Sequence, residues 1–338
     1  MTFFFRSISI VAFLLFVVLR SAHAEPVKLI FDTDIGNDVD DAMALATLHA
    51  LQSRGEAELL AVTITKDHAE CAPYVDALNT FYGRGNIPIG IVKEGAPPQK
   101  SRFTDVTLEK VDGEFVYPHD LNLGDSVANA VNVLRKTLAA QDDLSVVIVQ
   151  VGFSTNLARL MDSKKDQYSD LDGMALITRK VKAISIMAGA FAPIDGKVHL
   201  EFNVIRDIPA ARKLAREWPT PIIWSGFEIG LAVRYPAISI ERDFRYVERH
   251  PIAESYQRYI PTPHERPTWD LTSVLWAVRP DHNYFAMSEP GQVTIKETGE
   301  TTFEPSPNGR HTFLQMSREQ IAATREVLAA LTSEPPQN

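Results

Sequence analysis

Five aspartates lie within ten consecutive residues near the start of the chain. The segment FDTDIGNDVDDAMALA begins at residue 31 and contains Asp32, Asp34, Asp38, Asp40 and Asp41. Carboxylates this close repel one another and raise one another's pKa. One or two of them would serve as an acidic cap of the following helix, but five exceed what a cap requires. The cluster therefore indicates a site that holds a cation.

Two familiar sites with clustered aspartates fit this segment poorly. In an EF-hand loop the glycine stands at the sixth position and a glutamate at the twelfth, whereas here Gly36 falls at the fifth and Met43 at the twelfth. Haloacid-dehalogenase-type phosphatases also begin with a strand and an Asp-x-Asp pair. Gly36 occupies the place where that pattern has Thr or Val, so a phosphatase stays only as a rival hypothesis.

The elements that must position these aspartates alternate between strand and helix. The strands are apolar throughout, which is typical of a parallel sheet covered on both faces. We predict a single α/β domain over 25–334, Rossmann-like, with a mostly parallel central sheet flanked by helices. The predicted strands are 27–31, 59–64, 87–91, 144–151, 183–188 and 221–224, and the predicted helices are 42–51, 71–83, 126–138, 156–161 and 209–217.

The last hundred residues have a different character. Beyond about residue 238 the chain is polar and aromatic, and we expect short helical pieces and a loop. A helix is predicted over 270–278, and 291–315 resembles a β-hairpin that turns at SPNGR. Ser317 and Gln320 stand in capping-box spacing before a final helix.

In a parallel sheet, ligands bind at the carboxyl ends of the strands. Asp32 and Asp34 leave the end of the first predicted strand, and Asp40 and Asp41 begin the next helix. The helix dipole favours carboxylates at that position, and Gly36 permits a sharp turn between strand and helix. The aspartates are therefore expected at one mouth of the sheet.

The first residues are predicted to be a signal peptide. Residues 1–24 combine a positive charge at Arg6, a short apolar run and the small-residue pattern Ala22-His23-Ala24. These are the elements of a secretory signal, and the apolar run is short for a membrane span, which needs about twenty residues. We expect a secreted or periplasmic protein that is not attached to a membrane after cleavage.

Charge and cysteine content narrow the function classes. The net charge is −9 and no block of Lys and Arg occurs, which argues against nucleic acid as a partner. Cys71 is the single cysteine, so no intramolecular disulfide can form. We interpret it as a small buried apolar residue.

DTDIGNDVDDAMAL resembles the N-terminal signature of the inosine–uridine nucleoside hydrolase family, with two extra residues before the last Asp pair. Three further blocks resemble family blocks in the same order along the chain. They are VQVGFSTNLARL (149–160), MAGAFAPIDGKVHLEFNVIRDIPAARKL (187–214) and RPTWDLTSVLWA (266–277). The resemblance implies cleavage of the N-glycosidic bond of ribonucleosides, a role in purine or pyrimidine salvage, and a homodimer or homotetramer.

The resemblance also implies a Ca²⁺ ion at the bottom of the pocket. Its ligands would be the carboxylates of Asp34, Asp41 and Asp270 and the backbone carbonyl of Val151. Oxygen ligands suit this hard ion, and the ion would cancel the repulsion among the carboxylates. Asp34 resembles the family's general base, which takes a proton from a water molecule held by the ion.

Several residues match positions that bind ribose in the family. Asp40 aligns with a residue that grips a ribose hydroxyl, and Glu201 and Asn203 match the ribose-binding pair of the Glu-Phe-Asn block. Asp67 and Asp195 stand where ribose-binding asparagines are expected. Each of these two departures replaces an amide donor with a negative charge.

Trp269 departs from the family at the position before the last metal aspartate, where many members have a histidine that acts as the leaving-group acid. An indole is a donor only and does not ionise usefully, so the resemblance suggests stacking on an aromatic base. His264 or Glu265 on the preceding loop are candidates for the acid. The leading hypothesis is a Ca²⁺-dependent ribonucleoside hydrolase, and the alternative is a non-catalytic Ca²⁺-bound protein that binds nucleosides or sugars.

Overall fold

The computed structural model describes residues 25–337, so the predicted signal peptide lies outside the described residues. A single large sheet runs through the molecule in the order β12-β11-β13-β9-β8-β7-β1-β2-β3-β6, with β10 beside β13. Its strands are β1 (Val27–Thr33), β2 (Ala57–Ile64), β3 (Ile89–Ile91), β6 (Ala128–Asn129), β7 (Val146–Gln150), β8 (Val181–Met187), β9 (Ile222–Ser225), β10 (Ala286–Met287), β11 (Gly291–Ile295), β12 (Thr301–Pro305) and β13 (His311–Gln315).

The sheet confirms the prediction of a mostly parallel α/β fold. Every neighbouring pair from β6 to β13 is parallel, and only β10, β11 and β12 at one edge pair in antiparallel fashion. The strand order reverses around β1, which has β2 on one side and β7 on the other. Ligands bind at such a switch point in open α/β sheets.

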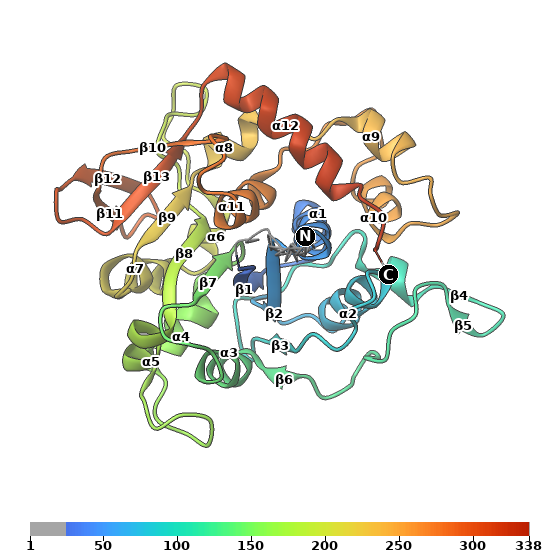
Figure 1. Ribbon diagram of the computed structural model, residues 1–338, viewed down its shortest axis with the longest axis horizontal. Helices are drawn as coiled ribbons and strands as arrows, with labels where there is room; N and C mark the ends of the chain where they lie inside the picture. Colours follow the sequence, from blue (N-terminus) through green and yellow to red (C-terminus); the bar gives the residue numbers. More distant parts are fainter. Residues whose placement is uncertain (1–24, 338) are drawn as a thin grey trace, which may run out of the picture.

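Helices cover both faces of the sheet, and each face has its own apolar core (Figure 1). On one face pack α1 (Asp40–Ser53), α2 (Cys71–Phe81), α8 (Phe227–Ala232), α9 (Ala237–Arg242), α10 (Pro251–Tyr259), α11 (Trp269–Val278) and α12 (Arg318–Thr332). On the other face pack α3 (Ala130–Ala139), α4 (Thr155–Asp162), α5 (Gly173–Lys180) and α7 (Ile208–Glu217).

Helix α1 follows the aspartate segment and is the innermost helix of its face. Its residues are buried from Asp40 through Leu51, because the sequence AMALATLHAL has no polar stripe to turn toward water. It packs against α11 and α12. The two helices that carry Asp40, Asp41 and Asp270 therefore lie side by side.

The C-terminal hairpin was predicted with the wrong turn. The hairpin pairs β11 with β12 and turns through residues 296–300. The segment SPNGR instead connects β12 to β13, which crosses to the far side of β11 and pairs in parallel with β9. Turn residues mark where a chain bends, but only the sheet decides which strands then pair. The predicted capping box of Ser317 and Gln320 is confirmed at the start of α12.

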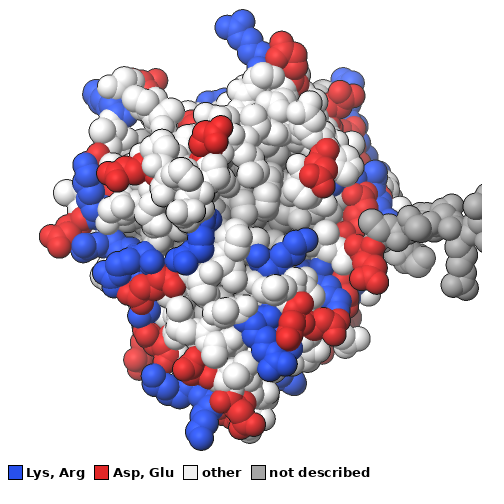
Figure 2. All heavy atoms as spheres, turned by 60° about the vertical axis from the view of Figure 1, so that its left-hand side comes forward, with Lys and Arg blue, Asp and Glu red and all other residues white. Residues whose placement is uncertain are grey.

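The surface carries charges of both signs. On the face shown in Figure 2, Lys and Arg side chains lie interspersed with Asp and Glu side chains. Among the described residues, no helix is long and apolar enough to span a membrane.

Candidate active site

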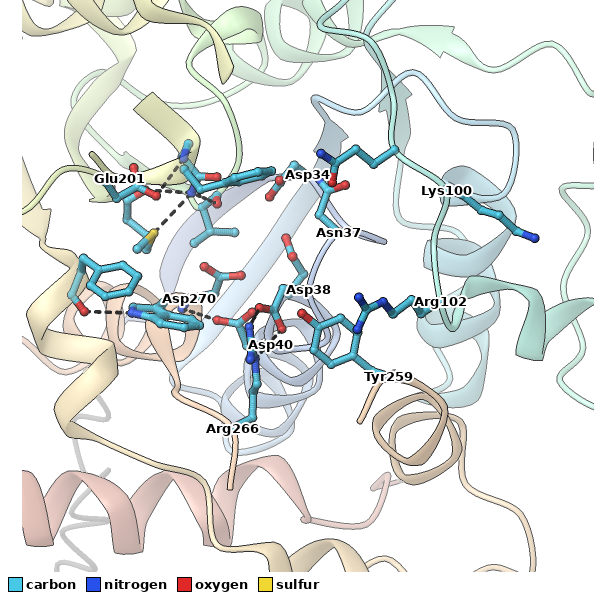
Figure 3. A pocket seen from close by; sticks show the side chains of 18 residues that line it. Asp34, Asn37, Asp38, Asp40, Lys100, Arg102, Glu201, Tyr259, Arg266 and Asp270 are labelled. Atoms are coloured by element: carbon cyan, nitrogen blue, oxygen red, sulfur yellow. Dashed lines mark hydrogen bonds and ion pairs between the residues drawn. The ribbon is translucent and has the colours of Figure 1, made fainter. Parts of the chain in front are cut away.

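A cavity of about 450 Å³ opens at the carboxyl ends of β1, β7 and β8. This volume is within the range of small-molecule sites. Figure 3 shows that carboxylates from several elements converge in it. The lining residues are Asp34, Asn37, Asp38, Asp40, Asp41, Gln99, Lys100, Arg102, Val151, Met187, Glu201, Phe202, Asn203, Phe227, Tyr259, Arg266, Trp269 and Asp270.

Four buried aspartates form what we call the acidic floor: Asp34, Asp40, Asp41 and Asp270. Carboxylate oxygens of Asp40, Asp41 and Asp270 lie within 4.8 Å of one another. Burial raises the pKa of all four carboxyls, and their mutual repulsion raises the pKa of Asp41 and Asp270 further. For Asp34 the pKa is raised to about 6.

Short hydrogen bonds hold the floor in place. The Thr33 hydroxyl donates to Asp41, the Asn37 amide donates to Asp34 Oδ2 at 2.5 Å, and the Asp270 backbone N–H donates to Asp40 Oδ2 at 3.3 Å. Gly36 has φ +101°, where an L side chain would be strained. The turn after β1 brings Asp34 to the mouth of the sheet, where the aspartates were expected, and it also brings Asn37, which was not predicted.

Asp32 lies beneath the floor and does not line the cavity. Its carboxylate accepts hydrogen bonds from Thr63 Oγ1 at 2.5 Å and from Asn156 Nδ2 at 2.8 Å. These bonds connect the end of β1 to β2 and α4. Asp32 therefore supports the end of β1 from below the cavity.

The chemistry of this donor set fits a divalent metal ion. Several buried carboxylates without cations between them would repel strongly, and hard oxygen ligands suit Ca²⁺. The structure adds Asp40 to the cluster, although the sequence assigned Asp40 to a ribose hydroxyl. The backbone carbonyl of Val151 belongs to the lining and also accepts a hydrogen bond from Asn203 Nδ2 at 2.7 Å.

Glu201 and Asn203, which were predicted to contact the sugar, both line the cavity. Glu201 caps α6 (Phe202–Arg206), and its carboxylate accepts N–H bonds from Asn203, Val204 and Gly189. Burial nevertheless raises the Glu201 pKa to about 7. The Asn203 amide nitrogen donates to the carbonyls of Val151 and Met187, so its carbonyl oxygen is the atom left for a ligand.

Four predicted site residues do not line the cavity: Asp67, Asp195, His264 and Glu265, whose carboxylate pairs with Arg325. Asp67 accepts a hydrogen bond from the Glu94 backbone N–H at 3.1 Å. Asp195 is exposed in a turn with φ +50°. His264 presents its backbone carbonyl to the Tyr256 hydroxyl at 2.6 Å, and burial lowers its pKa. Their assigned roles stay predictions.

Trp269 lines the cavity and is packed from behind. A Cβ placed on Gly230 would come within 2.3 Å of Trp269 Cα, so the indole lies directly on α8. Its Nε1–H donates to the Phe227 carbonyl at 2.8 Å. The indole is therefore held by α8 while it also lines the cavity.

Sequence reasoning did not single out Arg102, Phe227, Tyr259 and Arg266 as site residues. Arg266 pairs with Asp38, which lies 228 positions away in the sequence. No local pattern predicts such a pairing, although Arg266 stands inside the RPTWD block. Cys71 is buried as predicted, and burial raises the pKa of its thiol to about 12.

Comparison with known proteins agrees with this geometry. The family model described as inosine-uridine preferring nucleoside hydrolase matches residues 29–327. No curated protein matches the chain. Many solved structures are similar, and three of them, each at under 25% identity, support the fold.

A plant nucleoside hydrolase shares 22% identity, with a TM-score of 0.63 over 92% of this chain and 99% of its own. A purine-preferring ribonucleoside hydrolase from Gardnerella vaginalis shares 16%, with a TM-score of 0.66 over 90% and 99%. An inosine-uridine preferring nucleoside hydrolase from Bacillus anthracis shares 17%, with a TM-score of 0.62 over 90% and 99%.

The family match spans nearly all of the described chain, and the aspartate segment near its start contributes to the lining of the acidic cavity. The family match does not favour the alternative hypothesis of a non-catalytic binding protein. The chain therefore belongs to the inosine-uridine preferring nucleoside hydrolase family and is an N-glycosidase, a ribonucleoside hydrolase.

Proposed function

We propose that this enzyme hydrolyses the N-glycosidic bond of ribonucleosides in a Ca²⁺-dependent reaction that gives free base and ribose. The observation that carries the proposal is the cluster of Asp40, Asp41 and Asp270, whose oxygens lie within 4.8 Å of one another in the cavity. Buried carboxylates in this arrangement need a cation. Family membership supplies the reaction class.

Asp34, Asp41, Asp270 and the carbonyl of Val151 would hold the ion, with Asp40 beside them. When bound, Ca²⁺ would orient a water molecule and favour its deprotonation. Asp34 would accept that proton as general base, and the Asn37 amide that donates to it fixes its orientation. Glu201, Asn203 and Asp40 would bind the ribose hydroxyls, which holds C1′ in line with the water. Trp269 would stack on the base.

The test uses the mature protein with bound metal removed by chelation and then replaced. Release of reducing sugar from inosine, uridine, adenosine and cytidine should be lost in the chelated protein and return with Ca²⁺. Mg²⁺ should restore less of the activity than Ca²⁺, since Mg²⁺ demands a smaller and more regular ligand set. Full activity without metal would refute Ca²⁺ dependence. Ca²⁺-dependent nucleoside binding without sugar release would support the binding-protein alternative, and phosphate release from phosphate esters would support the phosphatase.

Secretion and assembly are also proposed. The signal sequence at residues 1–24 supports export with cleavage after Ala24. N-terminal sequencing of protein from the periplasmic and extracellular fractions should give Glu25 as the first residue. Analytical ultracentrifugation should give a homodimer or homotetramer, as the family suggests.

A further inference from the structure

Lys66 is a buried lysine whose ammonium group has no hydrogen-bond partner. It follows β2, the neighbour of β1 in the sheet, and the residue is 1% exposed. Among the described residues only two other Lys or Arg residues are buried, and each pairs with a carboxylate: Arg135 with Asp166 and Arg279 with Glu56. Lys66 Nζ has no such hydrogen-bonded partner. Because a buried cation is costly unless opposite charge lies nearby, the surroundings of Lys66 must supply that charge.

The ammonium lies against the turn that connects β1 to α1. A Cβ placed on Gly36 would come within 3.4 Å of Lys66 Nζ and within 3.4 Å of Cys71 Sγ. Gly36 stands between Asp34 and Asn37, which line the cavity, whereas Lys66 is not part of the lining. Lys66 Nζ therefore lies beside the turn that carries Asp34, outside the cavity itself.

The negative charges around Lys66 include two members of the acidic floor. Burial lowers the pKa of Lys66, and nearby negative groups raise it, among them the carboxylates of Asp34, Asp41 and Glu70. In return, the charge of Lys66 counteracts the rise in the pKa of Asp34 that burial causes. The Glu70 carboxylate is outside the lining and accepts a hydrogen bond from the Thr104 hydroxyl at 2.5 Å. Lys66 therefore compensates Asp34 and Asp41 through space, without a hydrogen bond.

This charge matters for a metal ion because the ion and the lysine would neutralise the same carboxylates. Asp34 and Asp41 are two of the ligands assigned to Ca²⁺ in the proposed function. An ion held by them would lie close to a second, fixed cation. Like charges in a protein interior repel one another over several ångströms, so a cation that is already in place reduces the gain from adding another.

We propose that Lys66 is a built-in counter-cation of the acidic floor, which offsets Asp34 and Asp41 in the metal-free protein and repels the ion in the metal-bound protein. Ca²⁺ then binds more weakly than the four carboxylates of the floor alone would bind it. The consequence is a site whose occupancy follows the surrounding Ca²⁺ concentration. This inference rests on the proposed function for the metal ligands, but it does not depend on turnover.

Calcium titration of the chelated mature protein, followed by calorimetry without substrate, tests the proposal. Lys66→Met removes the charge and keeps a side chain of similar length. It should lower the Kd for Ca²⁺ at least about tenfold, because a cation this near a divalent ion changes the binding constant by that factor or more. Lys66→Gln should change the Kd in the same direction. Lys66→Arg keeps the charge and should stay within about threefold of the wild-type Kd.

Lys180→Met is the matched control. The Lys180 side chain is 13% exposed, and its ammonium pairs with Asp143 at 2.9 Å and donates to the Gln141 carbonyl at 2.6 Å. It belongs to α5 on the other face of the sheet, so its loss should leave the Kd for Ca²⁺ unchanged. Thermal melts give a second readout. Stabilisation by a ligand grows with its affinity, so added Ca²⁺ should raise the Tm of Lys66→Met by more than that of the wild type.

An unchanged or higher Kd in Lys66→Met and Lys66→Gln would mean that Lys66 only supports the turn, and would overturn the proposal. Equal tightening in Lys66→Arg and Lys66→Met would also overturn it, because packing and not charge would then be the cause. If Lys66→Met does not fold, Lys66→Gln decides, and failure of both to fold in Ca²⁺ would count against the proposal. No Ca²⁺ binding by any of these proteins would refute the metal site as well. Tighter binding in Lys66→Met, with no sugar release from any nucleoside by the wild type, would refute hydrolysis alone.

Discussion

The acidic floor and the arginine–aromatic wall, which consists of Phe227, Trp269, Arg266, Tyr259 and Arg102, line the same cavity but are held by different contacts. The floor joins the ends of β1, α1 and α11, and buried helices fix its carboxylates. The wall joins a loop, α8, the end of α10 and the start of α11, and it is fixed mainly by cation–π contacts and the Asp38–Arg266 pair. In the proposed function the floor would serve the chemistry that all substrates share, whereas the wall would meet the base, which varies between substrates.

The largest effect should come from the floor. Asp34→Asn removes the proposed base and one negative charge beside the metal, and should lower kcat about 100- to 10,000-fold, the range for loss of a general base. Steady-state kinetics on inosine and on p-nitrophenyl riboside measure this loss, and kcat should fall by a similar factor for both substrates. Asp142→Asn, an exposed carboxylate paired with Lys28, is the control. A modest loss confined to inosine would contradict the division between floor and wall.

Trp269→Ala tests whether the indole stacks on the base or only packs. The stacking role predicts a rise in KM for nucleosides of roughly tenfold or more, in line with about 1–3 kcal/mol for stacking on a base. The contacts with Gly230 and Phe227 predict some loss of thermal stability as well. Trp269→Phe should keep KM close to the wild-type value, and it therefore separates loss of stacking from loss of packing. If Trp269→Ala leaves nucleoside kinetics unchanged but lowers the free energy of unfolding by several kcal/mol, Trp269 is a core residue.

The metal-free protein should become less stable as the pH rises from 5 to 7.5. Burial raises the pKa of Glu201 and of Asp32 to about 7, from ordinary values of 4.5 and 3.8. At these two carboxyls the folded state binds more protons than the unfolded state in this window, so their contribution to the free energy of unfolding falls with rising pH. Scanning calorimetry after chelation should show a decrease of a few degrees in Tm. Added Ca²⁺ should flatten the dependence, and a Tm that rises with pH would refute this account of the buried carboxyls around the site.

The smallest effect is expected at the exposed turn. Asp195→Asn restores the residue type that the family carries at this position, but the side chain lies outside the cavity. We expect kcat/KM for inosine to change by less than about twofold, because surface substitutions away from special features change free energies by within about 0.5 kcal/mol. A large gain in ribose affinity would show that the turn closes over the sugar.

The sequence alone was sufficient for the parallel α/β fold, for the end of β1 as the site, and for most of the floor. These are local properties: apolar runs predict buried strands, and residues that follow a strand must lie at its carboxyl end. The motif resemblance then located Asp270, Glu201 and Asn203, which no local pattern would have joined to Asp34.

Tertiary structure alone decided which side chains share the wall and which predicted residues stay outside. The Asp38–Arg266 pair and the stacking of Arg102 and Arg266 on Tyr259 join segments far apart in the chain. Such contacts depend on how α10, α11 and the loop before η1 (Thr104–Leu108) pack against one another. The spacing of residues along the sequence does not predict that packing. The same reason explains His264 and Asp195: each stands near a motif in the sequence, but neither side chain is part of the cavity lining.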